Sequence, residues 1–181
     1  MTKNEIRERV AQNKTGMGAP ILEANSTVAI RRLKGQKWFI SAKKVGAFAP
    51  VPDQPDVSLV MSDPEKTFYI PAYDEAFGGY RLAKMGETFK RSRLCGLEPV
   101  DPEFADADEI DLILVPGTAY DGEGNRIGPE EDVYEKLLPF YNALKVGVAF
   151  ECQYMADIPA DADDAVMDII LTEAKCLDCR D

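Results

Sequence analysis

The chain has 181 residues, of which 45% are hydrophobic and 29% are charged, and this predicts one globular domain, residues 1–181, with a sizeable core. Its net charge of −11, from 32 acidic and 21 basic side chains, repels polyanions, so we expect neither nucleic acid nor an anionic membrane as a partner. The sequence has no apolar run of the roughly 18 residues that span a bilayer and no signal-peptide core, and the expected compartment is therefore the cytoplasm.

In chain order, the first elements are expected to be helical. Residues 3–12 suit a short polar helix, and residues 13–25, which are rich in Gly, Asn and Pro, suggest a loop. Ser26 or Thr27 is a suitable N-cap for a second helix that runs through residues 28–40.

Strands are expected next. Residues 43–51 predict a buried strand that ends at Pro50, and residues 51–61 predict a turn followed by a helical or extended segment. Two β-rich segments joined by a glycine-containing turn come after them: residues 66–73, closed by Pro71, and residues 80–85.

The carboxyl-terminal half alternates apolar strands with a helix. Residues 110–117 form a continuous apolar run typical of a parallel strand buried on both faces. An amphipathic helix over residues 130–144, a strand over residues 145–153 and a final apolar run over residues 164–174 follow. This alternation predicts an α/β fold with a mainly parallel sheet. Ligands bind such sheets beyond the carboxyl ends of the strands, so the loop "VPGTAYDGEGNRIG" is the best-placed site.

Histidine is absent from the sequence, which removes the commonest general base and nitrogen ligand. Catalysis would then depend on carboxylates, Lys, Arg, Tyr, backbone dipoles or bound Mg²⁺. We expect Cys95 and Cys152 to be inert thiols. Cys176 and Cys179 have the CxxC spacing of half a zinc site or a redox pair, but a second pair is not visible nearby and the motif ends the chain, so we expect no function there.

Several motifs together resemble one enzyme family. "DLILVPGTAYDGEGNRIG" is followed by Tyr134 and by "VGVAFECQ", and the amino terminus carries Lys3 and Arg7 four residues apart. "GLEP" precedes the loop, and spaced residues complete the pattern: Pro159, Asp164, Asp168 and Glu173. This combination resembles the 5-formyltetrahydrofolate cyclo-ligase (methenyltetrahydrofolate synthetase) family.

The resemblance implies a three-layer α/β/α sandwich of the NagB/RpiA/CoA-transferase type. It also implies an ATP- and Mg²⁺-dependent ring closure on a reduced folate, by a monomer or homodimer. In that family, ATP phosphorylates the formyl oxygen of 5-formyltetrahydrofolate, N10 attacks, and phosphate leaves to give 5,10-methenyltetrahydrofolate. Such chemistry suits a protein without histidine, because phosphoryl transfer depends on positioning and charge neutralisation.

The resemblance also implies roles for single residues. Those expected at ATP are Lys3, Arg7, Gly124, Arg126 and Gly128. Arg126 and Tyr134 are expected in catalysis. Asp121 and Glu135 are expected to bind the metal. The residues expected to contact the folate are Gln54, Asp56 and Glu98. Structural alternatives stay open: Lys3 and Arg7 solvate a terminal helix, Arg126 braces its own turn, and Asp121 is the acceptor of an Asx-type turn.

Two departures from the family pattern concern the ligand sites. The family continues its loop as Arg-Leu-Gly-Tyr-Gly-x-Gly-Tyr-Tyr-Asp, whereas this chain has Pro129, Glu130, Glu131 and Asp132 after Gly128. The carboxylates either compete with a phosphate or serve as acidic residues at a helix N-terminus. On the folate side, Gln54 replaces a pterin-contacting Glu and loses its charge.

Three functions therefore compete. The favoured one is a cyclo-ligase with a rebuilt loop. The second is a family member that binds folate or nucleotide without ring closure. The third is different chemistry on the same fold, with Glu130 or Glu135 as base or nucleophile.

Overall fold

A sheet of seven strands forms the centre of the computed structural model, which describes residues 1–49 and 51–180. Its strand order is β11-β10-β9-β6-β1-β2-β3. In chain order the strands are β1 Lys44–Gly46, β2 Thr67–Asp74, β3 Gly79–Lys84, β6 Leu112–Val115, β9 Leu144–Val148, β10 Ile169–Leu171 and β11 Cys176–Asp178.

Five neighbouring strands of this sheet are parallel, from β10 through β9, β6 and β1 to β2. The edge strands β3 and β11 are antiparallel to their neighbours. All four residues of β6 are buried, as its apolar run predicts for a strand covered on both faces. The predicted α/β class with a mainly parallel sheet is confirmed.

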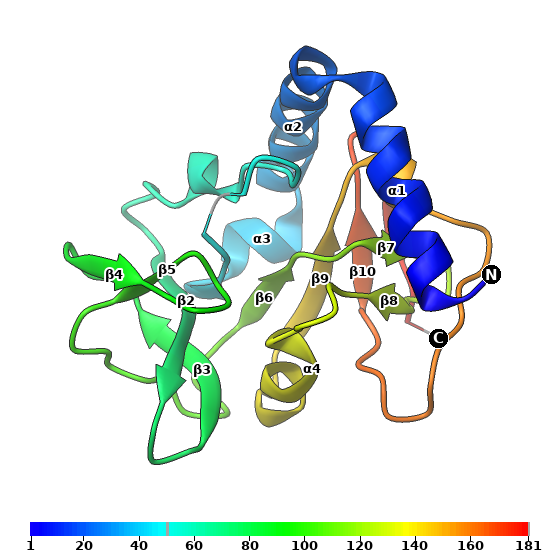
Figure 1. Ribbon diagram of the computed structural model, residues 1–181. Coiled ribbons are helices and arrows are strands. Elements are labelled where there is room, and N and C mark those ends of the chain that lie inside the picture. Colours follow the sequence, from blue (N-terminus) through cyan, green and yellow to red (C-terminus); the bar gives the residue numbers. More distant parts are fainter. Residues whose placement is uncertain (50, 181) are drawn as a thin grey trace.

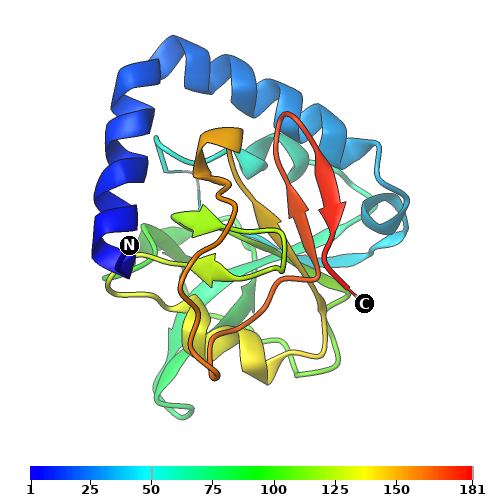
Figure 2. The ribbon, with the colours of Figure 1, turned by 90° about the vertical axis from the view of Figure 1, so that its right-hand side faces the viewer.

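Helices cover both faces of the sheet, which gives the three expected layers. Figures 1 and 2 show α2 and α3 on one face, and α1, α4 and the hairpin formed by β7 and β8 on the other. The helices are α1 Lys3–Met17, α2 Ala19–Lys34, α3 Lys37–Ser41 and α4 Tyr134–Leu137, with short 3-10 turns η1 Val57–Val60, η2 Leu138–Phe140 and η3 Glu151–Gln153. Two small sheets pair β4 Phe89–Arg91 with β5 Leu97–Pro99, and β7 Ala119–Tyr120 with β8 Arg126–Ile127.

The packing of α1 positions the site. Ile6 and Val10 lie one helical turn apart and are buried against Ala119, Ile127 and Ile158. Because Ala119 and Ile127 belong to the β7–β8 hairpin, this small apolar cluster holds the helix against the loop that follows β6.

The loop predicted for residues 13–25 is wrong, because most of it is helical. Gly18 alone separates α1 from α2, and its φ of 83° suits a residue without a Cβ. Pro20 falls in the first turn of α2, where a missing N–H costs nothing. The predicted helix over residues 28–40 also divides, since α2 ends at Lys34 and α3 begins at Lys37.

Three strand predictions need correction. Strand β1 is shorter than residues 43–51, and its predicted end at Pro50 lies outside the described residues. Pro71 does not close β2, which continues to Asp74. Pro71 pairs with Leu82 of β3 beyond the last β1 partner, so the proline needs no N–H on the β1 side.

The helix predicted over residues 130–144 is also too long. Only Tyr134–Leu137 is α-helical, and the chain continues as the 3-10 turn Leu138–Phe140 with Pro139 in its first positions. Proline cannot continue an α-helical hydrogen-bond ladder, so the helix stops there.

The CxxC tail forms the edge strand β11, which begins at Cys176.

Within residues 1–49 and 51–180, none of the helices combines the length and apolarity that crossing a bilayer requires.

Candidate functional site

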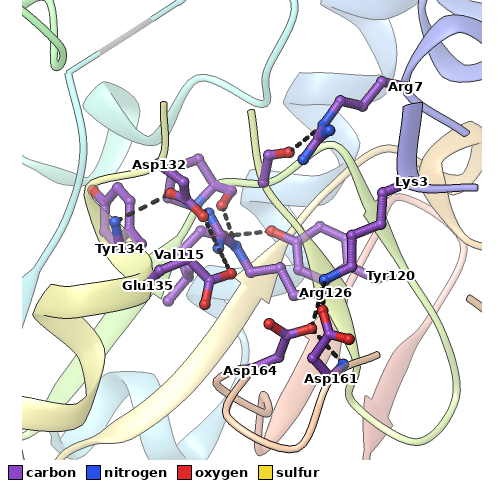
Figure 3. A network of polar contacts seen from close by, with 12 residues as sticks. Lys3, Arg7, Val115, Tyr120, Arg126, Asp132, Tyr134, Glu135, Asp161 and Asp164 are labelled. Carbon is purple, nitrogen blue, oxygen red and sulfur yellow. Dashed lines mark hydrogen bonds and ion pairs between the residues drawn. The ribbon is translucent and has the colours of Figure 1, made fainter. Parts of the chain in front are cut away.

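Arg126 is the centre of a buried polar network at the carboxyl end of β6 (Figure 3). Its Nε donates to the carbonyl of Pro116 at 2.8 Å. The two terminal nitrogens donate to both carboxylate oxygens of Asp132, at 2.6 and 3.1 Å. Only 1% of the Arg126 side chain and 7% of the Asp132 side chain are exposed, so water screens this ion pair little.

Two glycines make room for this network. A Cβ on Gly117 would lie 2.6 Å from the Tyr120 hydroxyl and 3.1 Å from Arg126 Nε. A Cβ on Gly128 would collide with the Asp132 carboxylate. Tyr120 in turn donates its hydroxyl to the Val115 carbonyl at 2.8 Å, which ties the hairpin to the end of β6.

Helix α1 brings two more cations to the same place. Arg7 Nε donates to the Gly128 carbonyl at 2.9 Å. Lys3 Nζ donates to Asp161 at 2.7 Å and to Asp164 at 2.8 Å. These two cations and Arg126 line one polar cavity of about 260 Å³ together with the backbone of Gly128. Four acidic residues also line it: Glu130, Asp132, Glu135 and Asp164. The amino-terminal cations therefore lie beside the turn that follows β6, and their role at a phosphate stays a prediction.

A second, more apolar cavity of about 300 Å³ adjoins the polar one, because both are bordered by Arg126, Pro129 and Asp132. Its other walls include Phe48, Val51, Pro71, Leu94, Tyr134 and Gln54. The Gln54 amide donates to the Gly117 carbonyl at 3.0 Å, whereas its buried Oε1 has no hydrogen-bond partner among the described residues. An unpaired buried acceptor is costly, so this oxygen is a candidate acceptor for a ligand N–H that reaches it.

Local charges set the protonation of the site. Burial opposes the charge of Arg126, but the Asp132 carboxylate outweighs it and raises the pKa of the guanidinium. Partial burial and the nearby Asp132 raise the pKa of Glu135. Burial raises the pKa of Tyr134 well above its ordinary value, and that of the Cys95 thiol to about 12, so both groups stay neutral walls of the apolar cavity at neutral pH.

Two predicted site residues lie in the β7–β8 turn, away from the walls of both cavities. Asp121 is 1% exposed, and its carboxylate accepts hydrogen bonds from the backbone of Glu123, Asn125 and Ile158 and from the Asn125 amide. The alternative of an Asx-type turn therefore accounts for Asp121. Gly124 has a φ of 86° and its carbonyl accepts from Met167 N–H, which is a structural reason for glycine there.

Two predicted folate contacts also lie outside the cavity walls. Asp56 caps η1 by accepting from the backbone and hydroxyl of Ser58. Glu98 is buried in β5, where it accepts from Tyr73 N–H at 3.4 Å and faces Lys90 at 3.6 Å. Their hydrogen-bonding capacity is used within the fold, so the structure does not bring them to the ligand cavities.

Sequence reasoning missed the roles of three acidic residues. It left Asp132 between competition with a phosphate and a place at a helix N-terminus, without Arg126 as its partner, and it quoted Asp164 as a motif residue without a partner. Pairing of Lys3 with Asp161 and Asp164 joins residues more than 150 positions apart, and no local pattern signals such a contact. Within the described part of the chain, no group of three or more His, Cys, Asp or Glu is arranged to hold a metal.

The Lys3–Asp164 contact predicts a pH-dependent stability. Burial opposes it, but hydrogen bonds from Asp161 N–H and from Lys3 lower the pKa of Asp164 below its ordinary value. The contact therefore stabilises the folded protein above the unfolded-state pKa of about 3.9. This stabilisation is lost as the pH falls through the lower pKa of the folded state. The wild-type protein is expected to lose stability between about pH 6 and pH 3. In Asp164→Asn we expect this loss to be smaller by up to about 1 kcal/mol.

Urea unfolding at both pH values measures this effect. Asp163→Asn is the matched control, because Asp163 is an exposed neighbour. An equal pH dependence in wild type and Asp164→Asn would show that the contact contributes nothing.

The fold and the site define an α/β protein in which a charged cavity, with both cations and carboxylates in its walls, borders a more apolar one. A sequence profile of the 5-formyltetrahydrofolate cyclo-ligase family matches residues 1–173, and the chain belongs to this family. The family predicted from the motifs is thereby confirmed, and its members are ATP-dependent ligases.

Individual relatives agree over nearly the whole chain. The 5-formyltetrahydrofolate cyclo-ligase of Mycolicibacterium smegmatis is 26% identical, covering 96% of this chain and 95% of its own, and that of Mus musculus is 22% identical, covering 94% and 93%. The solved structure of Aquifex aeolicus 5,10-methenyltetrahydrofolate synthetase has a TM-score of 0.88 at 29% identity and covers 100% of this chain and 94% of its own.

Proposed function

We propose that this chain converts 5-formyltetrahydrofolate to 5,10-methenyltetrahydrofolate, with ATP as phosphate donor, Mg²⁺ as cofactor, and ADP and phosphate as products. Membership of the family supports the reaction. The observation that carries the assignment of sites is the convergence of Lys3, Arg7 and Arg126 on one cavity that shares a wall with an apolar cavity. The proposed setting is cytoplasmic, and the proposed assembly is a monomer or homodimer.

In this proposal the polar cavity takes the polyphosphate of ATP. Lys3 and Arg7 neutralise its outer oxygens, and the guanidinium of Arg126 lies at the boundary where the transferred phosphoryl group meets the folate. Charge-assisted hydrogen bonds of this kind are about twice as strong as neutral ones. Phosphoryl transfer depends on positioning and on charge neutralisation more than on covalent or acid–base help from the protein. These cations can therefore support it in a chain without histidine.

The apolar cavity takes the pterin. The formyl oxygen of the bound 5-formyltetrahydrofolate attacks the γ-phosphorus of ATP, and ADP leaves. N10 then attacks the formyl carbon, its proton passes to solvent, and the C–O bond breaks to release phosphate. Gln54 Oε1 accepts an N–H of the pterin, and Tyr134 packs against the guanidinium of Arg126, whose Cζ lies 5.6 Å from the ring centroid. Tyr134 thereby serves the reaction by positioning Arg126.

The residues of the polar cavity fit a magnesium ion held mainly by its nucleotide. Mg²⁺ keeps several waters and is usually bound through one or two carboxylates together with substrate phosphates. Glu135 lines the polar cavity and is the carboxylate we assign to the metal, whereas Asp121 has its oxygens occupied in its own turn. When bound, Mg²⁺ would neutralise charge that develops on the transferred phosphoryl group.

The second candidate is binding without turnover, and the observation that favours it is the occupation of Arg126 by Asp132. A single assay separates the two. Purified protein is mixed with 5-formyltetrahydrofolate and Mg-ATP, and the methenyl chromophore and ADP are followed together. We expect both to form in equal amounts, whereas folate binding without ADP release would support the second candidate and overturn the first.

The contribution of α1 to ATP binding is testable by matched substitutions on one helix. We expect Arg7→Met to raise the KM for ATP about tenfold, because a charge-assisted contact contributes about 1.5–3 kcal/mol. Arg9→Met is the control, because Arg9 is an exposed residue of the same helix outside both cavities. Steady-state kinetics that show the same KM in both variants would contradict the placement of ATP beside α1.

A further inference from the structure

We propose that Asp132 is an internal competitor of the nucleotide: its carboxylate holds Arg126 while the site is empty, and a phosphate group must displace it. This inference rests on the proposed function, because it concerns the arginine assigned to ATP. It assigns a specific role to the acidic loop that replaces the family's glycines.

The geometry of the pair supports competition for the same donors. A guanidinium presents its N–H groups as a fork that matches two oxygens of either a carboxylate or a phosphate. Asp132 fills that fork with both oxygens, and Arg126 Nε is already used by the Pro116 carbonyl. A phosphate that contacts the terminal nitrogens of Arg126 would therefore meet the Asp132 carboxylate in its place (Figure 3).

The surroundings of the pair point to the same conclusion. Both residues border the polar and the apolar cavity, so Asp132 lies where the transferred phosphoryl group must pass. Two anions at that point would repel each other, and a buried carboxylate without its cation is costly. By contrast, Glu130 and Glu131 are exposed and form no ion pair with another described residue. Of the three acidic side chains in the loop, only Asp132 is therefore placed to compete for Arg126, although Glu130 also borders the polar cavity.

The attachment of Asp132 to the rest of the protein is slight. Apart from Arg126, its carboxylate accepts one hydrogen bond, from Tyr134 N–H at 3.1 Å. The preceding residues of the loop, 129–131, are exposed. A side chain held mainly by Arg126 is free to turn away once another anion takes the guanidinium. The observed Kd for ATP is then the intrinsic Kd divided by the fraction of molecules in which Asp132 has released Arg126.

The test is isothermal titration of the full chain with Mg-ATP. Asp132→Asn keeps an oxygen for Tyr134 N–H but removes the charge, and we expect its Kd for ATP to fall about tenfold or more relative to wild type. Glu131→Gln makes the same change of charge one position away, and we expect its Kd to stay within about twofold of wild type, because exposed charges are screened. In an Arg126→Met background, Asp132→Asn should give no gain.

Several outcomes would overturn the inference. These are an unchanged or higher Kd in Asp132→Asn, an equal gain in Glu131→Gln, or a gain that persists without Arg126. If Asp132→Asn does not fold, Asp132→Gly is titrated instead. If either variant folds only when inorganic phosphate is present, the inference is supported, because the external anion then replaces the carboxylate. If wild type turns over but Asp132→Asn shows no gain, the inference alone fails. If no variant binds ATP, the proposed function fails with it.

Discussion

Arg126→Met is expected to lower kcat/KM for methenyltetrahydrofolate formation by about a thousandfold, the lower end of the range for an arginine that stabilises a phosphoryl-transfer transition state. Arg126 borders both cavities, whereas Lys3 and Arg7 border only the polar one. The proposed substrates therefore meet at this guanidinium. The rate of appearance of the methenyl chromophore at limiting substrate measures the loss, and folate binding by titration should persist.

A matched double variant guards against unfolding. Arg126→Met alone leaves Asp132 without its cation, which destabilises the fold by up to about 3–5 kcal/mol, the full value applying when the carboxylate stays buried. Arg126→Met combined with Asp132→Asn removes both charges and should recover most of that stability in urea unfolding. It should remain inactive, and wild-type kcat/KM in the folded double variant would refute the catalytic role.

Leu114→Ala is expected to destabilise the protein by about 3–5 kcal/mol, a large part of the roughly 5–15 kcal/mol that stabilises a typical domain. Leu114 is fully buried in β6, which lies between β1 and β9 at the centre of the sheet. The cavity left by the lost methyl groups cannot collapse easily where strands pack on both sides. Urea unfolding followed by circular dichroism measures the change.

The control for this prediction is Leu59→Ala. Leu59 is 47% exposed in η1, so its truncation should change stability by no more than about 0.5 kcal/mol. Similar losses in the two variants would mean that β6 is not the packed centre of the domain.

The central sheet could be predicted because its strands carry their own signal. The run at residues 112–115 is apolar at every position, and a strand buried on both faces requires that pattern. Helix ends were harder to predict, because a single glycine and a well-placed proline decided them. Gly18 interrupts the helical structure for one residue only, and Pro20 lies in the first turn of α2, where a proline is tolerated.

The site could be predicted in part. Lys3 and Arg7 were placed by resemblance, and the physical reason for their position is the packing of Ile6 and Val10 on the β7–β8 hairpin. The partner of Arg126 could not be predicted, because the loop after Gly128 bends back to it and only tertiary structure shows that path. The charge pattern alone gave all the loop acids equal weight.

The structure also distinguishes between the two sequence-based interpretations of the acidic loop. Glu130 and Glu131 are exposed, so they do not fill the polar cavity even where they border its rim or its neighbour. Of the loop acids 130–132, Asp132 is the one that pairs with the buried arginine, and Glu135 of α4 lies 3.8 Å from the same guanidinium. The loop therefore leaves open a cavity of about 260 Å³ that contains Lys3, Arg7 and Arg126 in its walls. In our proposal, Asp132 is the carboxylate of the loop that a phosphate has to replace at Arg126.

A crystal structure of the protein with Mg²⁺ and a non-hydrolysable ATP analogue tests the central claim most directly. We predict that the terminal phosphate lies within hydrogen-bond distance of Arg126, that Lys3 or Arg7 contacts the same polyphosphate, and that Asp132 has turned away from the guanidinium. An analogue bound elsewhere, with Arg126 still held by both oxygens of Asp132, would contradict the account.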